Sequence, residues 1–410
     1  MSEIHCRACG TNLSHIFCDL GMSPLSNSFL RADQLNAAEI FFPLRTHVCH
    51  KCFLVQLQEY ECPEAIFSDY LYFSSYSESW LQHAQEFAIW AKDQFNLGEQ
   101  SLVVEIASND GYLLQYFRAM GIPVLGIEPA ANVATVAEEK GIPTIVRFFG
   151  AALAEEFTAT GQKASMIVGN NVLAHVPSLN DFVAGMKLLL ADDGIISMEF
   201  PHLLQLVEQN QFDTIYHEHF SYLSLHAVER IFSTHGLRIF DVSELTTHGG
   251  SLRILATHNY NSRYPARTSV GALRSREGHA GLLSLSAYAS FSEKVRRVKR
   301  ELLAFLIDAK NSEKSIAAYG AAAKGNTLLN FCGIGTDFID FVADVSPHKQ
   351  GMFLPGTHIP IVSPQKVFDT KPHYLLILPW NLRKEVIEQM SSIRNWGGKF
   401  IIPIPKLEIV

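Results

Sequence analysis

The sequence predicts an α/β protein in which a small cysteine-rich segment precedes two units of alternating strands and helices. Six of the seven cysteines lie before residue 63. Strand-like and helix-like segments then alternate twice along the chain, and such alternation is typical of doubly wound, mostly parallel sheets. The length of 410 residues is sufficient for two or three domains, each with its own apolar core.

The first element expected is a helix in "SESWLQHAQEFAIWAKDQFNL", which starts at Ser77 and repeats apolar residues at helical spacing. Short buried strands follow in "SLVVEIA", "VLGIEP", "SMIVGN" and "GIISMEF", with helices between them. The last two strands of this unit, "LRIFDVSEL" and "GSLRILATH", leave little room for a helix between them. We therefore expect that pair to run antiparallel.

Residues near 258–282 are polar and irregular in pattern, and we expect a connection between domains there. A charged helix, "FSEKVRRVKRELLAFLIDAKN", leads into the second unit. Its strands are expected in "SIAAYG", "FIDFVAD", "YLLILPW" and "KFIIPIP". These patterns place the domain boundaries at 1–75, 76–260 and 261–410.

The net charge of −8 and the lack of a Lys/Arg block disfavour nucleic acid as a partner. The N-terminus has neither the basic nor the apolar region of a secretory signal. The longest apolar runs are far shorter than the roughly 20 residues that a membrane helix needs. We expect a cytoplasmic protein with no membrane partner.

Cys6, Cys9, Cys49 and Cys52 form two C-x2-C pairs with 39 residues between them. Each pair can close a tight turn that directs two thiolates at one ion, and two such turns complete a tetrahedral site of four sulfurs. The spacing predicts a zinc site whose role is structural, because no position is left open for water. The expectation for Cys18 and Cys62 is that they are small buried hydrophobes.

The segment "VVEIASNDGYLL" ends the first central strand and opens a helix, which is typical of a nucleotide-binding loop. Gly occurs in it only at position 111, so the spacing is not that of a dinucleotide fingerprint. Glu105 ends the first strand, and Glu128, at the end of the second, can accept both ribose hydroxyls of an adenosine. This order, with the antiparallel pair at the end, favours S-adenosylmethionine over NAD.

Titratable residues gather in "DTIYHEHFSYLS", which runs from Asp213 to Ser224, and His175 lies in "NNVLAHVPSLNDF" after the fourth strand. Such a cluster is either an acid–base site or the polar edge of an ordinary fold. In an extended segment His217 and His219 share a side, so the pattern does not choose between them. Further along, "AAYGAAAKGN" resembles a phosphate cradle in which Lys324 adds charge.

Together these motifs resemble the C-methyltransferases that act on nucleotide-linked keto-deoxysugars, the 3-C-methyltransferase group of branched-sugar biosynthesis. The matching features are the C-x2-C pairs, "YLYFSSYSESW", "EIASNDGYLL", "NNVLAHVP", "EFPHLLQLVEQNQFDTIYHEHFSYLSL", "THGGSLRI" and "YGAAAKGNTLLN". The resemblance implies an N-terminal zinc-binding domain, a central class I methyltransferase domain with a Rossmann-like fold, and a C-terminal Rossmann-like domain. Ala107 and Asn109 replace two glycines of the general methyltransferase pattern, as is usual in this family.

The resemblance also implies which residues act. His219 is expected as the base, Glu218 as an orienting or substrate-binding carboxylate, and Tyr216 and His175 as partners near the sugar. Either Tyr72 or Tyr76 is expected to reach in from the junction after the zinc-binding domain. The residues expected to contact S-adenosylmethionine are Glu105, Ala107, Ser108, Asn109, Gly111, Glu128, Asn170 and Asn171. Those expected to contact the nucleotide sugar are Arg253, Gly320, Lys324, Gly325 and Asn326.

The function predicted is methylation of C3 of a nucleoside-diphosphate 4-keto-6-deoxysugar, expected to be TDP-linked, by an enzyme that uses S-adenosylmethionine. A histidine base removes the proton next to the ketone, since its ordinary pKa lies near the operating pH. Methylation at C5 or at an oxygen, and a nicotinamide oxidoreductase of a nucleotide sugar, are the alternatives. A non-enzymatic scaffold is disfavoured by the cluster at 216–219. The chain is expected to be a monomer or a homodimer.

Overall fold

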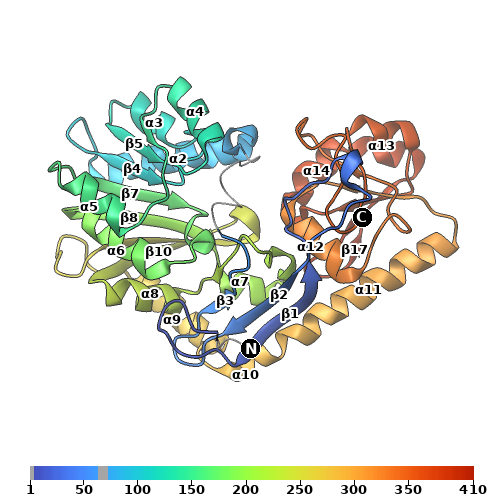
Figure 1. Cartoon of the computed structure of the whole chain (residues 1–410), viewed down its shortest axis with the longest axis horizontal. Helices are drawn as coiled ribbons and strands as arrows, with labels where there is room; N and C mark the ends of the chain where they lie inside the picture. The colour runs from blue at the N-terminus through green and yellow to red at the C-terminus, as the bar shows by residue number, and fades with distance from the viewer. Residues whose placement is uncertain (1–3, 63–72) are drawn as a thin grey trace.

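Three β-sheets organise the chain in a computed structural model that describes residues 4–62 and 73–410 (Figure 1). The N-terminal strands, drawn in blue, lie between the central sheet with its helices and the C-terminal sheet with its own. Among the described residues, none of the helices is both long and apolar enough to pass through a membrane.

The N-terminal sheet takes one of its strands from the middle of the chain. β3 pairs antiparallel with β9, where Val55 faces Tyr222, and the Leu57 amide donates to the Phe220 carbonyl at 2.9 Å. This pairing attaches the segment that follows residues 216–219 directly to the cysteine-rich domain. The order is β1-β2-β3-β9, with β1 (His15–Ser23), β2 (Phe42–Val48), β3 (Val55–Leu57) and β9 (Ser221–Tyr222).

The central sheet has the order β10-β11-β8-β7-β4-β5-β6. Its strands run parallel except β11, which is antiparallel to both β10 and β8, so the predicted antiparallel pair is confirmed. The strands are β4 (Val103–Ile106), β5 (Val124–Ile127), β6 (Thr144–Ile145), β7 (Ala164–Asn170), β8 (Leu190–Pro201), β10 (Leu237–Leu245) and β11 (Ser251–His258). The chain order reverses between β4 and β7, and ligands bind at the carboxyl ends of strands at such a point.

Helices precede and follow these strands. They are α2 (Glu78–Phe95), α3 (Leu114–Ala119), α4 (Ala131–Glu139), α5 (Ala151–Thr158), α6 (Leu179–Leu189), α7 (Leu203–Glu208) and α8 (Leu225–Thr234). α2 is the predicted helix, and the Ser77 hydroxyl caps it by accepting from the Trp80 amide at 3.3 Å. Short 3₁₀ turns carry several site residues: η2 (Ser74–Tyr76), η3 (Leu173–His175), η4 (Phe212–Thr214) and η5 (Thr247–Gly249).

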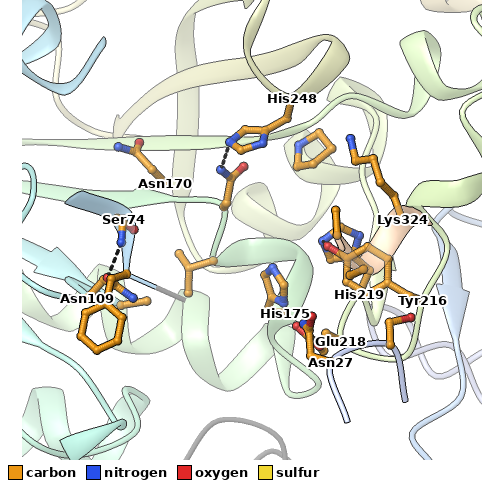
Figure 2. A pocket seen from close by; sticks show the side chains of 18 of the residues that line it. Asn27, Ser74, Asn109, Asn170, His175, Tyr216, Glu218, His219, His248 and Lys324 are labelled. Atoms are coloured by element: carbon orange, nitrogen blue, oxygen red, sulfur yellow. Dashed lines mark hydrogen bonds between the residues drawn. The ribbon is translucent and has the colours of Figure 1, made fainter. Parts of the chain in front are cut away.

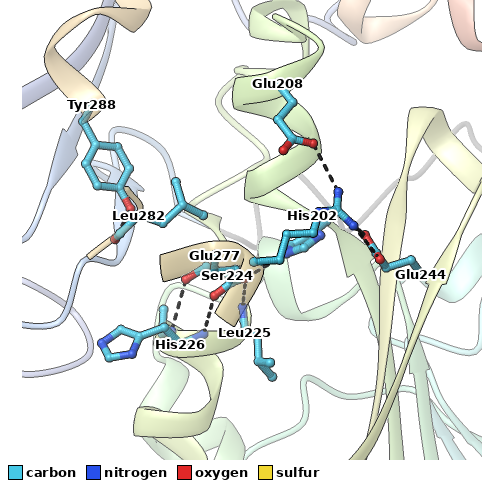
Figure 3. A network of polar contacts seen from close by, with 11 residues as sticks. His202, Glu208, Ser224, Leu225, His226, Glu244, Glu277, Leu282 and Tyr288 are labelled. Atoms are coloured by element: carbon cyan, nitrogen blue, oxygen red, sulfur yellow. Dashed lines mark hydrogen bonds and ion pairs between the residues drawn. The ribbon is translucent and has the colours of Figure 1, made fainter. Parts of the chain in front are cut away.

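The expectation of an irregular connection near 258–282 is wrong, because α9 (Thr268–His279) lies there. This helix buries only Val270, Leu273 and Glu277, so its sequence has no apolar stripe to predict it. Its anchor is polar: the Glu277 carboxylate accepts from the amides of Leu225 and His226, at the N-terminus of α8, at 2.6 and 3.0 Å (Figure 3). The same carboxylate lies 2.8 Å from Nε2 of His202, which precedes α7.

The C-terminal sheet has the order β14-β13-β12-β15-β16-β17, parallel except for β17, which confirms the second α/β unit. Its strands are β12 (Ile316–Tyr319), β13 (Val342–Ala343), β14 (Ile361–Val362), β15 (Tyr374–Ile377), β16 (Lys399–Ile402) and β17 (Glu408–Ile409). The helices are α10 (Leu285–Ala289), the predicted charged helix α11 (Phe291–Asn311), α12 (Ala323–Cys332), α13 (Gln365–Thr370) and α14 (Arg383–Gln389). Two 3₁₀ turns, η6 (Trp380–Leu382) and η7 (Ser391–Trp396), lie in the same domain, and η1 (Ala32–Gln34) lies in the N-terminal domain. The boundaries at 75 and 260 remain predictions, since β9 belongs to the N-terminal sheet and α9 packs against β10.

Candidate active site

One cleft of about 1300 Å³ gathers most of the predicted site residues (Figure 2). The loops after β4, β5 and β7 line it from the central sheet, and residues 25–29 line it from the N-terminal domain. The turns after β12, β13 and β15 line it from the C-terminal sheet. Its volume is above the usual range for one small ligand, so the cleft has room for a second molecule.

The loop after β4 adopts a backbone that usually requires glycine. Ala107, Asn109 and Gly111 have φ angles of 57°, 50° and 75°, which is the left-handed region. These alternate positions include the two at which glycine is replaced, so the replacements keep the turn of the general pattern. The loop is held from outside, because the Asn109 side-chain oxygen accepts from the Ser74 amide at 2.9 Å.

Glu128 lies at the end of β5 with only 5% of its surface exposed, and burial raises its pKa. Its two oxygens accept from the amides of Asn109 and Ala130, both at 2.9 Å. Each carboxylate oxygen can accept a second hydrogen bond, and Glu128 lines the cleft. The buried carboxylate beside a glycine-like loop therefore fits the adenosine of S-adenosylmethionine.

The other residues predicted for this ligand divide into two groups. Ala107, Asn109, Asn170 and Asn171 line the cleft with Glu128. Glu105, Ser108 and Gly111 do not line it but support the loop from behind. Glu105 is fully buried, which raises its pKa well above the usual range, and a Cβ at position 126 would stand 2.5 Å from the Ser108 hydroxyl.

The segment 216–219 is not extended, because the His219 amide donates to the Tyr216 carbonyl at 2.9 Å and closes a turn. The turn separates the two histidines that an extended segment would place on one side. His217 packs against the rings of Phe42 and Tyr60 of the N-terminal domain, with its Nε2 3.4 Å from the Pro43 carbonyl oxygen.

His219 faces the other way, toward Tyr216 and His175. These three residues and Glu218 line the cleft together and form the acid–base cluster. Its Nδ1 lies 2.8 Å from the Thr214 carbonyl oxygen and its Nε2 lies 2.9 Å from the Tyr216 hydroxyl. A carbonyl oxygen only accepts, so Nδ1 carries the proton and Nε2 has the free electron pair. The edge of the His175 ring meets the His219 ring at a centroid distance of 4.7 Å.

Burial changes the acidity of this cluster in two directions. It lowers the pKa of His175 to about 4, and burial together with the neighbouring His175 lowers that of His219 well below its usual range. It raises the pKa of Glu218 to about 7, although Asn27 donates to that carboxyl group at 2.5 Å. At neutral pH the site therefore holds neutral imidazoles beside a carboxyl group poised to ionise.

The junction after the N-terminal domain reaches the cleft through Tyr76, one of the two tyrosines considered for the site. Tyr76 lines the cleft with 65% of its surface exposed, and its ring stacks on Phe73. Tyr72 lies outside the described residues. Ser74 and Ser75 donate backbone hydrogen bonds to the side chains of Asn109 and Asp110, so the junction is attached to the loop after β4.

The stretch "HGGSLR" divides between cleft and core. His248 lines the cleft, with Nε2 2.8 Å from the Asn171 side-chain nitrogen. Arg253, predicted to contact the nucleotide sugar, does not line it. Its guanidinium pairs with the buried Glu199 at 2.7 Å and lies over the Phe87 ring.

On the C-terminal side, Gly320 and Lys324 line the cleft, and their contact with a nucleotide sugar stays a prediction. The Lys324 ammonium donates to the Asn381 side chain at 2.8 Å and lies over the Trp380 ring. The structure does not bring Gly325 and Asn326 into the lining. Gly325 packs against Leu378, and Asn326 is only 1% exposed.

Asp344 is a cleft residue that the sequence analysis missed. It follows β13, and its two oxygens accept from the amides of Ala321 and Ser346 at 2.7 and 2.8 Å. This repeats the arrangement of Glu128 after β5, with a carboxylate at the end of a second strand held by the loop after the first. The sequence could have indicated Asp344, because it ends the predicted strand "FIDFVAD" just as Glu128 lies at the end of the predicted strand "VLGIEP".

The four predicted cysteines form one cluster. Their sulfur atoms all lie within 4.8 Å of one another, with Cys6–Cys52 at 3.4 Å and Cys9–Cys49 at 3.6 Å. A tetrahedral zinc ion with Zn–S bonds of about 2.3 Å separates its sulfurs by about 3.8 Å, so the cluster fits zinc. Cys18 is buried as expected, but Cys62 is exposed, so that expectation is wrong. Cys62 lies just beyond the packed strands.

Three family models match the chain in succession. They are described as a putative zinc binding domain over residues 6–67, a methyltransferase domain over 80–242 and a C-methyltransferase C-terminal domain over 246–405. The C-methyltransferase NovU of Streptomyces niveus is 35% identical over 405 residues, which cover 99% of this chain and 96% of that protein. The match therefore spans all three domains.

Two solved structures resemble less than half of the chain. Magnesium protoporphyrin IX methyltransferase of Synechocystis PCC 6803 is 16% identical and covers 43% of this chain and 79% of its own, with a TM-score of 0.34. An S-adenosylmethionine-dependent methyltransferase of Clostridium acetobutylicum ATCC 824 is 11% identical and covers 43% and 92%, with a TM-score of 0.36. Scores this low do not bear on the fold or the activity.

Proposed function

The chain belongs to the S-adenosylmethionine-dependent C-methyltransferase family that its motifs resemble, and we propose that it methylates C3 of a nucleoside-diphosphate 4-keto-6-deoxysugar in branched deoxysugar biosynthesis. One observation carries the proposal: the donor-side residues Asn109 and Glu128 and the acid–base residues Glu218 and His219 line the same cleft. In Figure 2 Asn109 lies toward one end and Glu218 and His219 toward the other, with His175 between them. S-adenosylmethionine, when bound, supplies an electrophilic methyl group to the sugar carbon.

The residues of the chain must first make that carbon nucleophilic. A carbon next to a ketone becomes so only when its proton leaves, and we assign the removal of this proton to His219. Its Nε2 holds a free electron pair because Nδ1 donates to the Thr214 carbonyl. Burial keeps the ring neutral at physiological pH, so the base needs no prior deprotonation.

Tyr216 has a part that depends on the bound sugar. Without the sugar, its hydroxyl donates to His219 Nε2 at 2.9 Å. A sugar that presents its C3–H to Nε2 takes the place of this hydroxyl, which then donates to the neighbouring keto oxygen. As the proton moves to Nε2, the electron pair of the C–H bond delocalises onto that oxygen. A donor placed there stabilises the enolate.

Glu218 and His175 complete the sugar site in this proposal. Both line the cleft, and Glu218 is 5% exposed, so it accepts from a sugar hydroxyl in a largely dry environment. The His175 ring meets His219 edge-on and keeps the base in its orientation. Tyr76 contributes from the open side of the cleft, where it is largely exposed.

We propose that the C-terminal side of the cleft holds the TDP part of the substrate. Gly320, with φ 89°, stands against Pro379, so a side chain there would block the turn after β12. Lys324 brings a positive charge to the same turn, and Asp344 offers a carboxylate to a deoxyribose hydroxyl. Arg253, Gly325 and Asn326 lie outside the lining, so the proposal rests on Gly320 and Lys324.

Of the alternative functions, only methylation at C5 agrees with the family. The family transfers methyl groups to carbon, which does not agree with an O-methyltransferase or a nicotinamide oxidoreductase. C5 remains an alternative to C3, since both carbons flank the C4 ketone and lose a proton by the same chemistry. The contacts around His219 do not distinguish these two carbons.

Incubation of the protein with S-adenosylmethionine and TDP-4-keto-6-deoxyglucose, followed by NMR of the sugar, tests the proposal. We expect a new methyl signal attached to C3 and loss of the C3–H signal. A methyl group on C5 would change the position proposed for methylation but would agree with the proposed chemistry. Absence of a methylated product from this and related 4-keto-6-deoxysugar nucleotides would contradict the substrate class.

A further inference from the structure

The loop between β1 and β2 of the zinc-binding domain crosses to the C-terminal domain. Leu30 and Phe353 exchange two backbone hydrogen bonds of 2.9 and 2.8 Å. Further along the loop, the Glu39 carboxylate accepts from the Gly356 amide at 2.7 Å and lies 3.0 Å from the His358 Nε2. The loop is therefore fastened to the C-terminal domain at two places.

The part of this loop before Leu30 forms a wall of the cleft. Residues 25–29 line it, and Phe29 is buried beneath the Lys349 ammonium, 5.3 Å from the ring centroid. Asn27 is the member of this wall that contacts the acid–base cluster. Its side-chain nitrogen donates to Glu218 Oε1 at 2.5 Å, across 191 positions of the sequence (Figure 2).

We propose that Asn27 is a positioning residue through which the zinc-binding domain orients the Glu218 carboxylate and keeps it ionised during turnover. This inference rests on the proposed function, in which Glu218 contacts the sugar. A buried carboxylate without a donor is strongly disfavoured in its charged form. An amide held on a loop fastened at Leu30 and Glu39 supplies that donor in a fixed direction.

The other groups around Glu218 do not take this part. His217 and His219 flank it in the turn, but their Nε2 atoms face Pro43 and Tyr216. His175 forms a hydrogen bond with the backbone of Glu218. Burial raises the pKa of Glu218 and the Asn27 hydrogen bond opposes the rise, which agrees with the direct contact.

The test compares Asn27→Ala and Asn27→Asp with wild type, and uses Asn36→Ala, an exposed position of the same loop, as the matched control. kcat/KM for the keto-sugar nucleotide is measured between pH 5.5 and 9. Loss of the hydrogen-bond donor in Asn27→Ala should raise the pKa of Glu218, and with it the midpoint of the acidic side of the kcat/KM profile, by about one pH unit. The added negative charge should move it further in Asn27→Asp. Zinc content and S-adenosylhomocysteine affinity should equal those of wild type and Asn36→Ala.

An unchanged profile for Asn27→Ala, or an equal loss at every pH, would overturn the inference, because a loosened fold lowers activity uniformly. The ¹³C titration of the Glu218 carboxyl group, assigned by its absence in Glu218→Gln, gives a readout without turnover. If wild type methylates no keto-sugar nucleotide, the proposed function fails, and this titration still decides the role of Asn27. A higher midpoint in Asn27→Ala supports the role, and an equal midpoint refutes it.

Discussion

The Tyr216 hydroxyl oxygen lies 2.9 Å from Nε2 of His219, and the opposite nitrogen of that ring lies 2.8 Å from the Thr214 carbonyl oxygen. The carbonyl determines the tautomer, and the tyrosine occupies the nitrogen that would act as the base. A substrate must therefore displace one hydroxyl group to reach His219. Burial, together with the neighbouring His175, lowers the pKa of this ring and keeps the base neutral over the working pH range.

The pH dependence of turnover should report Glu218 rather than His219. Burial lowers the pKa of His219 well below its usual range and raises that of Glu218 to about 7. If Glu218 acts as a carboxylate, kcat/KM should rise with pH through a limb near 7. Glu218→Gln should lower the rate and remove this limb. A limb that survives in Glu218→Gln would assign it to another group.

The stability of the folded protein should also depend on the ionisation of Glu218. A folded-state pKa above the ordinary value of 4.5 means that the folded chain binds this proton more tightly than the unfolded chain. Stability is then lost as pH rises from about 4.5 to 7. Glu218→Gln should stabilise the protein by on the order of 2–3 kcal/mol at pH 8 and by less at pH 5. Thermal unfolding at both pH values checks this, with the exposed Glu138→Gln as the control.

Removal of the Glu128 carboxylate should weaken binding of the methyl donor. Glu128→Ala loses charge-assisted hydrogen bonds worth roughly 1.5–3 kcal/mol, which is about 10- to 100-fold in affinity. Calorimetry with S-adenosylhomocysteine measures the loss, and the exposed Glu138→Ala should bind as wild type does. Equal affinities of Glu128→Ala and wild type would place the adenosine elsewhere.

The zinc site should contribute to folding and to the active site together. Cys49→Ser should lower the zinc content from about one ion per chain and reduce the melting temperature, because metal binding is coupled to folding. Cys62→Ser is the matched control, since Cys62 is exposed and outside the cluster. Activity should fall with the metal, because β3 of this domain pairs with β9 beside the acid–base turn. Full zinc content in Cys49→Ser would refute the assignment.

Local patterns were enough to predict the two α/β sheets and the metal site, but not the N-terminal sheet. The buried strands are continuous apolar runs, and the C-x2-C spacing reflects turns of a few residues, so both are visible within short windows. Glu128 was predicted because strand-end carboxylates occupy a fixed place in a doubly wound sheet. Asp344 occupies the equivalent place in the second sheet and was overlooked there.

The remaining site residues depend on contacts between distant parts of the chain. Asn27 lies in an ordinary polar loop, and the contacts of that loop with the C-terminal domain at Phe353 and Gly356 hold it beside Glu218. α9 is held by the buried Glu277 rather than by an apolar stripe. The turn at Tyr216 separates two histidines that an extended strand would align. None of these contacts has a signature in the sequence.

Exchange of the sugar protons with deuterated water tests the central claim most directly, because it separates proton removal from methyl transfer. With S-adenosylhomocysteine bound, wild type should exchange C3–H of the keto-sugar nucleotide, and NMR distinguishes this proton from C5–H. His219→Ala should lose this exchange and lower turnover by roughly 10²–10⁴-fold, with both ligands still bound. His217→Ala, on the other side of the turn, should keep the exchange. Exchange at the wild-type rate in His219→Ala, with loss in His217→Ala or Tyr216→Phe, would contradict the assignment of the base.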